Sequence, residues 1–472
     1  IDAQNYPSPA FDVASVAANI VDASAGLSEY AIESYFARLS LAYKDRYVVN
    51  ATIRTDGSSR FAPDCRWGWF PSVSVGWNVS NESFWNAEKT DLKIRASYGR
   101  TGNQDGISNY GWQALISGGV NYGGQSGIAI SSSGNDRLTW ETADQYNAGF
   151  DLSFLGGKIN MIADVYLKNT NNLLYSKPVH ATTGETSILS NIGSMRNKGV
   201  EFTINTHLNL GKVLWSSSFN IARNVNKLTS LLEDDLLSIG ANRALKLGRT
   251  VGSWYIFRTD GIYQYDGEVP QALYDKGVRA GDVKYWDRNG DGNITDDDRI
   301  VTGNPNPKFS GGWNNTFKYK GLELSLFFTY SYGNDVYASW MIHGSKPGYT
   351  RSLLKAYADN RWTGPGTSDK YPRAIYSYSG WNGKNSTMYL TDGSFIRLRS
   401  VTLGYTFPQR LVSKIHLKGL RVYAQGDNVF LCSRYPGWDP ETSVNLDPRF
   451  YGEDNDGVPQ PRIFKLGVNI TF

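Results

Sequence analysis

The chain has 472 residues, with 48 Lys and Arg against 44 Asp and Glu, so its formal net charge is +4. This near balance excludes the concentrated basic surface that typifies nucleic-acid binding. No apolar run reaches the ~18 residues that a membrane-spanning helix requires. Abundant aromatic residues and glycines favour a β-rich protein, and the sequence leaves open whether its two cysteines, Cys65 and Cys432, form a disulfide.

Apolar and polar residues alternate one by one through most of the chain from about residue 34. In residues 91–100, for example, Leu92 and Ile94 fall on the face opposite to Lys93 and Arg95. Because a strand side chain changes face at every step, this period of two predicts extended strands. About thirteen are expected, near residues 34–43, 46–56, 70–79, 91–100, 140–152, 158–169, 197–208, 212–223, 309–319, 321–332, 395–406, 420–428 and 462–472.

The two faces of these strands differ in chemistry. One is apolar almost without interruption, as at Ile159, Leu324 and Leu466. The other carries charge, and its predicted members include Lys93, Arg95, Asp164, Glu201 and Glu323. Short links alternate with long ones, which span residues 102–138, 171–195, 227–308 and 333–394. These features are typical of a transmembrane antiparallel β-barrel, with an apolar outer surface, a polar lumen and long extracellular loops.

A soluble β-protein also shows alternation, because one face of its sheet meets water. The alternative is therefore a soluble β-rich surface binding protein or adhesin, which would purify without detergent. A third class, a β-rich glycan hydrolase, would need a matched pair of carboxyl groups. The sequence marks no such pair, no phosphate loop and no nucleophile elbow. We therefore expect no catalytic residue and no enzymatic activity.

The number of strands bears on how much of a barrel the chain forms. Bacterial single-chain barrels have an even number of strands, whereas the count here is odd. We therefore expect residues 1–33 to be the remnant of an extracellular loop and residues 34–472 to be the C-terminal portion of a larger barrel. Independent helices are not obvious, but the leucine spacing within residues 228–247 predicts a short helix in the long loop 227–308.

The sharpest motif lies in that loop, where residues 287–298 read Asp-Arg-Asn-Gly-Asp-Gly-Asn-Ile-Thr-Asp-Asp-Asp. It matches the calcium-loop pattern at positions 1, 3, 5, 6 and 12, with Asp at the position where Glu is usual. Ca²⁺ prefers several oxygen ligands, and alternating side chains can supply them around a sharp glycine turn. A structural calcium site is predicted, and an acidic turn without metal is the alternative. The predicted ligands are Asp287, Asn289, Asp291, Asn293 through its main-chain carbonyl, and Asp298.

The same region resembles a known family. Residues 281–287 read Gly-Asp-Val-Lys-Tyr-Trp-Asp and residues 303–309 read Gly-Asn-Pro-Asn-Pro-Lys-Phe, on either side of the acidic loop. This arrangement is similar to the SusC/RagA-type TonB-dependent outer-membrane transporters. Further blocks agree, at residues 54–61 with 69–77, 95–104, 197–201 and 395–399. The resemblance covers most of residues 30–472 in the expected order.

The resemblance implies more than periodicity can show. Members of the family form barrels of about 22 strands around an N-terminal plug. They pair with a SusD-like surface lipoprotein and import oligosaccharides or peptides across the Gram-negative outer membrane with energy delivered by TonB. The chain departs from the full pattern because it contains no plug and no segment that would contact the TonB complex. We expect the substrate to be an oligosaccharide, with a peptide as the second alternative. We also expect outer-membrane lipid to surround the barrel.

Several aromatic residues fall in the long loops, among them Trp340 and Trp381. Aromatic side chains anchor protein interfaces, and their flat faces also stack on sugars. For these two residues we favour contact with the lipoprotein. Contact with a ligand is the second alternative, and packing against other loop residues is the third.

Overall fold

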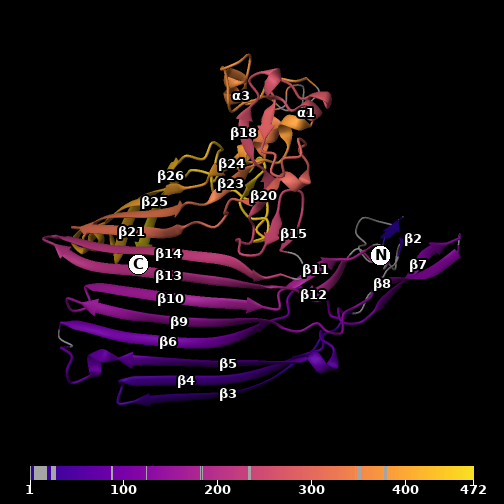
Figure 1. Cartoon of the computed structure of the whole chain (residues 1–472). Helices are drawn as coiled ribbons and strands as arrows, with labels where there is room; N and C mark the ends of the chain where they lie inside the picture. The colour runs from indigo at the N-terminus through magenta and orange to yellow at the C-terminus, as the bar shows by residue number, and fades with distance from the viewer. Residues whose placement is uncertain are drawn as a thin grey trace.

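The computed structural model describes residues 2–4, 19–22, 28–86, 89–123, 125–180, 182, 184–185, 187–231, 235–345, 347, 352–376 and 380–472. In this part of the chain thirteen strands form one antiparallel sheet, in which each strand pairs with the next strand of the sheet along the chain (Figure 1). We call this sheet the wall. Its strands are β3 (Ile32–Tyr43), β4 (Tyr47–Ser58), β5 (Trp67–Asn78), β6 (Thr90–Asn103), β9 (Glu141–Phe154), β10 (Ile159–Asn171), β13 (Ser194–Leu210), β14 (Val213–Ser230), β21 (Phe309–Tyr319), β22 (Leu322–Tyr332), β25 (Phe395–Thr406), β26 (Gly419–Ser433) and β28 (Ile463–Thr471).

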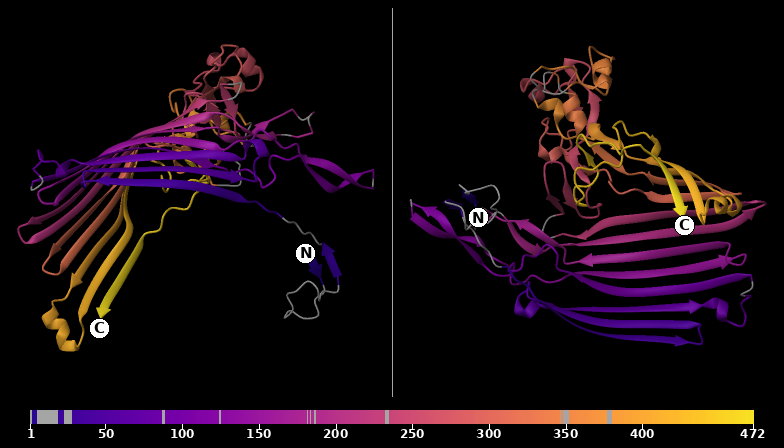
Figure 2. Two further views of the ribbon diagram at one scale, coloured as in Figure 1. Left: turned by 90° about the horizontal axis from the view of Figure 1, so that it is seen from below. Right: turned by 180° about the vertical axis from the view of Figure 1, so that it is seen from behind.

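All thirteen predicted strands are confirmed, most within two or three residues of the expected ends. The wall is strongly curved, as Figure 2 shows from below. Short turns join the strands at one end. At the β3–β4 turn, Lys44 and Asp45 both have positive φ values, 51° and 53°. Turns of that hand match the twist of the strands they join, so they close hairpins tightly.

Long links occupy the other end of the wall. Two of them form hairpins, β7 (Leu115–Tyr122) with β8 (Gln125–Ser132) and β11 (Leu174–Pro178) with β12 (Ser187–Asn191). Near the N-terminus β1 (Asp2–Gln4) pairs with β2 (Asn19–Asp22). The described residues of 235–308, 333–394 and 434–462 fold together above the wall, and we call them the loop module (Figure 1).

The loop module contains short strands and helices. Its strands are β15 (Leu236–Ser238), β16 (Ala244–Lys246), β17 (Trp254–Phe257), β18 (Thr259–Ile262), β19 (Val283–Tyr285), β20 (Arg299–Thr302), β23 (Asp335–Ala338), β24 (Leu390–Asp392) and β27 (Glu453–Asp454). Its α-helices are α1 (Gln271–Asp275), α2 (Trp340–Gly344) and α3 (Lys355–Asn360), while α4 (Gln409–Val412) lies in the short link between β25 and β26.

The helix predicted within residues 228–247 is wrong. There β14 continues to Ser230 through its pairing with β13, and β15 pairs with β16, so the described backbone is extended. Cross-strand hydrogen bonds satisfy the main chain that a helix would otherwise satisfy internally. Residues 232–234 of this stretch lie outside the described part.

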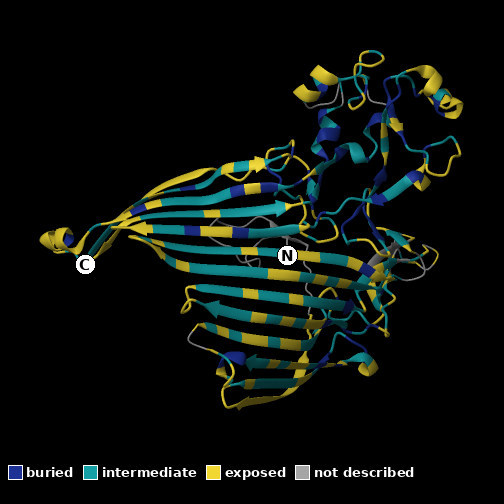
Figure 3. Ribbon diagram, turned by 60° about the vertical axis from the view of Figure 1, so that its left-hand side comes forward, coloured by how far each residue is buried: buried dark blue, intermediate teal, exposed yellow. Residues whose placement is uncertain are grey.

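Burial separates the wall from the loop module (Figure 3). The wall exposes large apolar side chains along its length; Leu466, for example, is 86% exposed. The loop module contains two clusters of buried residues, one around Trp254 and Tyr337 and the other around Val283 and Tyr285. None of the described helices has the length and apolar character needed to cross a membrane. Cys65 and Cys432 are both free thiols, so they do not form the disulfide that the sequence left open.

Candidate functional site: a two-faced wall and its loop module

Strand register gathers the predicted charged residues on one face of the wall. Arg95 and Asp164 both lie opposite Gly149, and Asp164 in turn lies opposite Glu201. Directly paired residues share a face, so these charges are neighbours although they come from β6, β10 and β13. The Arg95 guanidinium donates to both carboxylate oxygens of Asp164 at 2.6 Å. It also lies 3.3 Å from Asp151, whose register partner is Lys93.

A second group of charges continues this polar face near the C-terminus. Glu323 lies 2.8 Å from Arg421 and 3.0 Å from Lys318. Further along, the Lys465 ammonium lies 2.7 Å from the Asp427 carboxylate. Opposite charges paired in this way keep the face polar without a large net charge. All five predicted polar-face residues, Lys93, Arg95, Asp164, Glu201 and Glu323, therefore lie on the predicted side.

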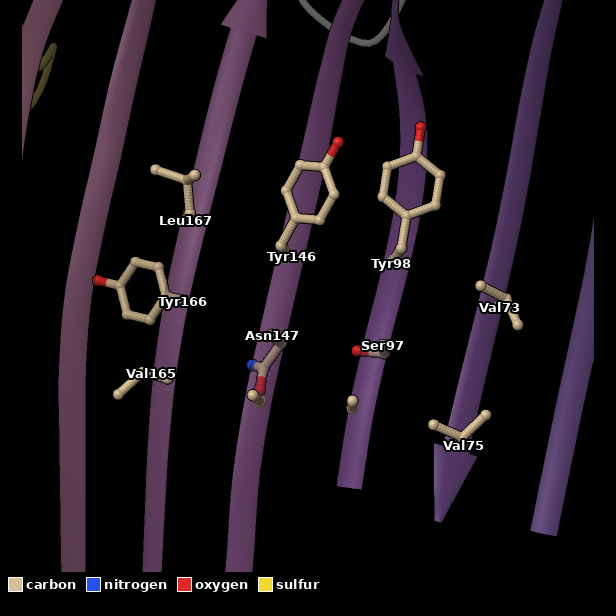
Figure 4. A pocket seen from close by; sticks show the side chains of 11 residues that line it. Val73, Val75, Ser97, Tyr98, Tyr146, Asn147, Val165, Tyr166 and Leu167 are labelled. Atoms are coloured by element: carbon tan, nitrogen blue, oxygen red, sulfur yellow. The ribbon is translucent and has the colours of Figure 1, made fainter. Parts of the chain in front are cut away.

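The opposite face is apolar and contains a hollow of about 520 Å³ between β5, β6, β9 and β10. Figure 4 shows Tyr98 and Tyr146 side by side within it, their ring centroids 5.0 Å apart. The next row of the same face contains Ala96 and Ala148, directly paired. Because small alanines stand between larger side chains in neighbouring rows, the surface dips there. The shape and apolar lining of this hollow are compatible with the binding of an apolar hydrocarbon chain.

Glycines in the wall make room for tyrosine rings on neighbouring strands. Tyr423 lies directly opposite Gly467, and a Cβ at Gly467 would come within 2.3 Å of the Tyr423 ring. Tyr166 stands in the same relation to Gly199, and Tyr330 to Gly311. An aromatic ring that covers a cross-strand glycine protects its backbone and fixes the register. These pairs escaped the sequence analysis because neither the glycine nor the tyrosine indicates its partner.

Arg243 connects the loop segments at the centre of the loop module. Its side chain is fully buried, stacks 4.2 Å from the Trp254 ring and donates to the carbonyl oxygens of Gly252, Phe450 and Tyr451. Burial lowers the pKa of Arg243 to about 10, opposed in part by Glu453 at 3.9 Å. Carbonyl acceptors and an aromatic face thus compensate a buried cation.

A second ion pair fastens the loop module to the wall. Arg397 of β25 lies 2.5 Å from Asp439 and 2.7 Å from Glu441, and the Arg397 and Asp439 side chains are only 3% and 1% exposed. Asp439 also accepts the main-chain N–H groups of Glu441 and Gln460. Because the two charges are buried together, this pair holds residues 434–462 against the strand. From the sequence, residues 395–399 are predicted as part of a strand and of a family block, and nothing in them indicates Asp439 as a partner.

The acidic loop 287–298 is compact, and its predicted ligands cluster around the main chain. Asp287 accepts the N–H groups of Gly290 and Gly292, at 2.7 and 2.8 Å. Asp298 accepts the N–H groups of Arg288 and Thr295 and is fully buried. Asp291 bonds to both Asn289 and the Asn293 N–H. The carboxylates of Asp287, Asp291 and Asp298 therefore accept hydrogen bonds from the loop's own main-chain N–H groups and stabilise its turn.

Among the described residues no cluster of three or more His, Cys, Asp or Glu side chains is placed to hold a metal ion. The predicted set at residues 287–298 includes two asparagines, one of which would contribute only its main-chain oxygen. The donor types suit a hard cation, and calcium at this loop stays a prediction.

The two predicted contact tryptophans lie in different surroundings. Trp381 donates its indole N–H to the Val283 carbonyl at 2.9 Å and meets Tyr285 edge to face, so it packs inside the loop module. Trp340 opens α2, donates to the Tyr435 hydroxyl at 3.0 Å and lines a cleft. Their roles toward a ligand or lipoprotein stay predictions.

Comparison with known proteins agrees with this architecture. Residues 2–429 match the family model described as TonB dependent receptor-like, beta-barrel. TonB-dependent receptor P26 of Formosa agariphila is 35% identical over 467 residues, which cover 94% of this chain and 46% of that protein. TonB-dependent receptor SusC of Bacteroides thetaiotaomicron is 31% identical over 464 residues, covering 93% and 43%.

Among solved structures, that of the RagAB peptide transporter superposes with a TM-score of 0.82 at 23% identity, covering 98% of this chain and 50% of that one. At this identity the likeness concerns the fold. The chain thus spans about half the length of the relatives that it matches. A wall with one charged and one apolar face, the family match and the similarity to SusC together show that the chain belongs to the TonB-dependent receptors, of SusC/RagA type.

Proposed function

We propose that the chain forms part of the wall of a nutrient importer in the outer membrane of a Gram-negative bacterium. The observation that carries this proposal is the division of the wall into two faces. Paired charges such as Arg95 and Asp164 would keep a lumen wet, while exposed apolar residues such as Leu466 would face lipid. Backbone pairing from strand to strand satisfies the polar main chain in that setting.

The substrate that we propose is an oligosaccharide, taken up together with a SusD-like surface lipoprotein and with energy from TonB. Support comes from the similarity to SusC and from the size of the folded loop module at one end of the wall. Passage requires no bond chemistry from the wall residues.

An uptake assay tests the proposal. The full-length transporter, with its lipoprotein, would be expressed in a strain that lacks it and supplied with matched panels of oligosaccharides and peptides. We expect uptake of at least one oligosaccharide that stops when TonB is deleted. Uptake of peptides alone would contradict the oligosaccharide assignment but would still support the proposal that the protein is a nutrient importer.

The alternative of a soluble surface binding protein has its own measurement. Membrane fractionation of the full-length protein should place it in the outer membrane and should require detergent to release it. Purification as a monodisperse protein without detergent would contradict the importer proposal altogether.

A further inference from the structure

A cleft of about 650 Å³ opens between α2 and the segment that connects β26 to β28. This volume lies within the range of ordinary small-ligand sites. Two tryptophans, Trp340 and Trp438, contribute to its lining together with Asp454 and Asp456. Among the described residues that line the cleft, none is basic.

Buried polar groups hold the Trp340 ring in place. Its indole N–H donates to the Tyr435 hydroxyl at 3.0 Å, and that hydroxyl donates to Asp454 at 2.6 Å. Asp454 also accepts the Gly457 N–H at 2.9 Å. Burial and the hydrogen bond to Asp454 raise the pKa of Tyr435. The hydroxyl therefore stays protonated, so it accepts from Trp340 and donates to Asp454. The Trp340 ring is therefore oriented before any ligand arrives.

The second indole is displayed to solvent from an anchored backbone. Trp438 is 80% exposed, although the next residue, Asp439, is buried in its ion pair with Arg397. Tyr435, three residues earlier, is buried as well. Because Trp438 lines the same cleft as Trp340, its exposed ring adds a second large, rigid aromatic surface to that cleft.

We propose that this cleft binds a segment of a neutral oligosaccharide. The faces of Trp340 and Trp438 would stack on the C–H faces of sugar rings, and the two carboxylates would accept hydrogen bonds from sugar hydroxyls. The described lining has two carboxylates and no basic group, which disfavours uronic or sulfated sugars there. The inference rests on the proposed function and names the part of the chain that recognises the glycan.

The test uses the full-length transporter in detergent and isothermal titration with neutral hexaoses (malto-, cello-, xylo-, laminari- and mannohexaose), with an oligogalacturonate and with a mixed peptide library. We expect Trp438→Ala to raise the Kd for the preferred neutral hexaose about tenfold, which corresponds to about 1.4 kcal/mol. Trp438→Phe, which keeps a ring, should lose less. Leu446→Ala is the matched control, because Leu446 is a similarly exposed apolar residue of the same segment that does not line the cleft.

The outcomes separate this inference from the proposed function. Tight binding of a neutral hexaose that Trp438→Ala leaves unchanged overturns the cleft assignment and leaves oligosaccharide import standing. Binding of no hexaose by the wild-type protein overturns both. The inference is also overturned if the wild-type protein binds the oligogalacturonate or peptides more tightly than any neutral hexaose and Trp438→Ala weakens that binding. Loss of lipoprotein binding in Trp438→Ala with normal glycan affinity would assign the cleft to the protein partner and overturn it as well.

Discussion

In the wall, Leu466 is 86% exposed, whereas in the loop module Trp254 is completely buried. Both residues are large and apolar, and they belong to one chain. The wall is organised by strand pairing and leaves many apolar side chains exposed, whereas the loop module is organised around buried clusters. The comparison shows that one chain contains regions with opposite burial of apolar residues. The same apolar-to-polar substitution should therefore have different consequences in the two regions.

The largest effect should follow from breaking the buried ion pair between the two regions. Arg397→Ala leaves Asp439 buried without its counter-charge, which should cost about 3–5 kcal/mol. We expect segment 434–462 to become accessible to protease while the wall stays folded, as measured by limited proteolysis of the full-length transporter. The double variant Arg397→Met with Asp439→Asn, which removes both charges but keeps an oxygen acceptor for the main-chain N–H groups, should restore part of the protection. A single variant as resistant as the wild type would show that the pair does not fasten the loop module.

A charge placed on either face of the wall tests its two-sidedness. Ile204 and Thr203 are adjacent near the middle of β13 and face opposite sides. Ile204→Arg should destabilise the folded transporter in bilayers by about 2–4 kcal/mol, because the charge would enter lipid. Thr203→Arg should be nearly neutral, because its side chain would enter water. Thermal unfolding in lipid vesicles measures both, and equal losses would reject the assignment of the faces.

The glycine–tyrosine pairs should matter less but more specifically. Gly467→Ala brings a methyl group within 2.3 Å of the Tyr423 ring, so the ring must move, at a cost of about 1–3 kcal/mol. The three atoms nearest to that methyl position all belong to the Tyr423 side chain. Tyr423→Ala should therefore make Gly467→Ala harmless, and a double-variant cycle on unfolding temperature tests it. Additive losses would mean that the ring does not depend on the glycine.

The smallest effect concerns calcium in the loop module. If the acidic loop binds Ca²⁺, titration of the full-length protein should give a Kd on the order of 10⁻⁴–10⁻³ M, as in extracellular modules. Asp287→Asn should weaken that binding at least severalfold, while unfolding in the presence of chelator should hardly change. Asp296→Asn is the control, since Asp296 is exposed and pairs with Arg299 outside the predicted ligand set. Identical calcium titrations for wild type and Asp287→Asn would leave an acidic turn without metal.

Much of the wall could be predicted because its signal is local. The alternation of Leu92, Lys93, Ile94 and Arg95 assigns each residue to a face, and the register later joins Arg95 to Asp164 without changing those faces. The acidic loop was likewise visible as a contiguous motif. The leucines of residues 228–247 misled, because their spacing fits a helix, and only the partners β13 and β16 show that the backbone is extended.

The sequence by itself determined the strands, the two faces of the wall and the family, since each depends on neighbours in the chain. Only the tertiary structure decided that distant loops share a core, that Arg243 reaches Phe450 and Tyr451, and that Trp340 and Trp438 line one cleft. The physical reason is range. A strand's two faces follow from backbone geometry one residue at a time, whereas a buried ion pair or a cleft forms only when segments far apart in sequence exclude water together.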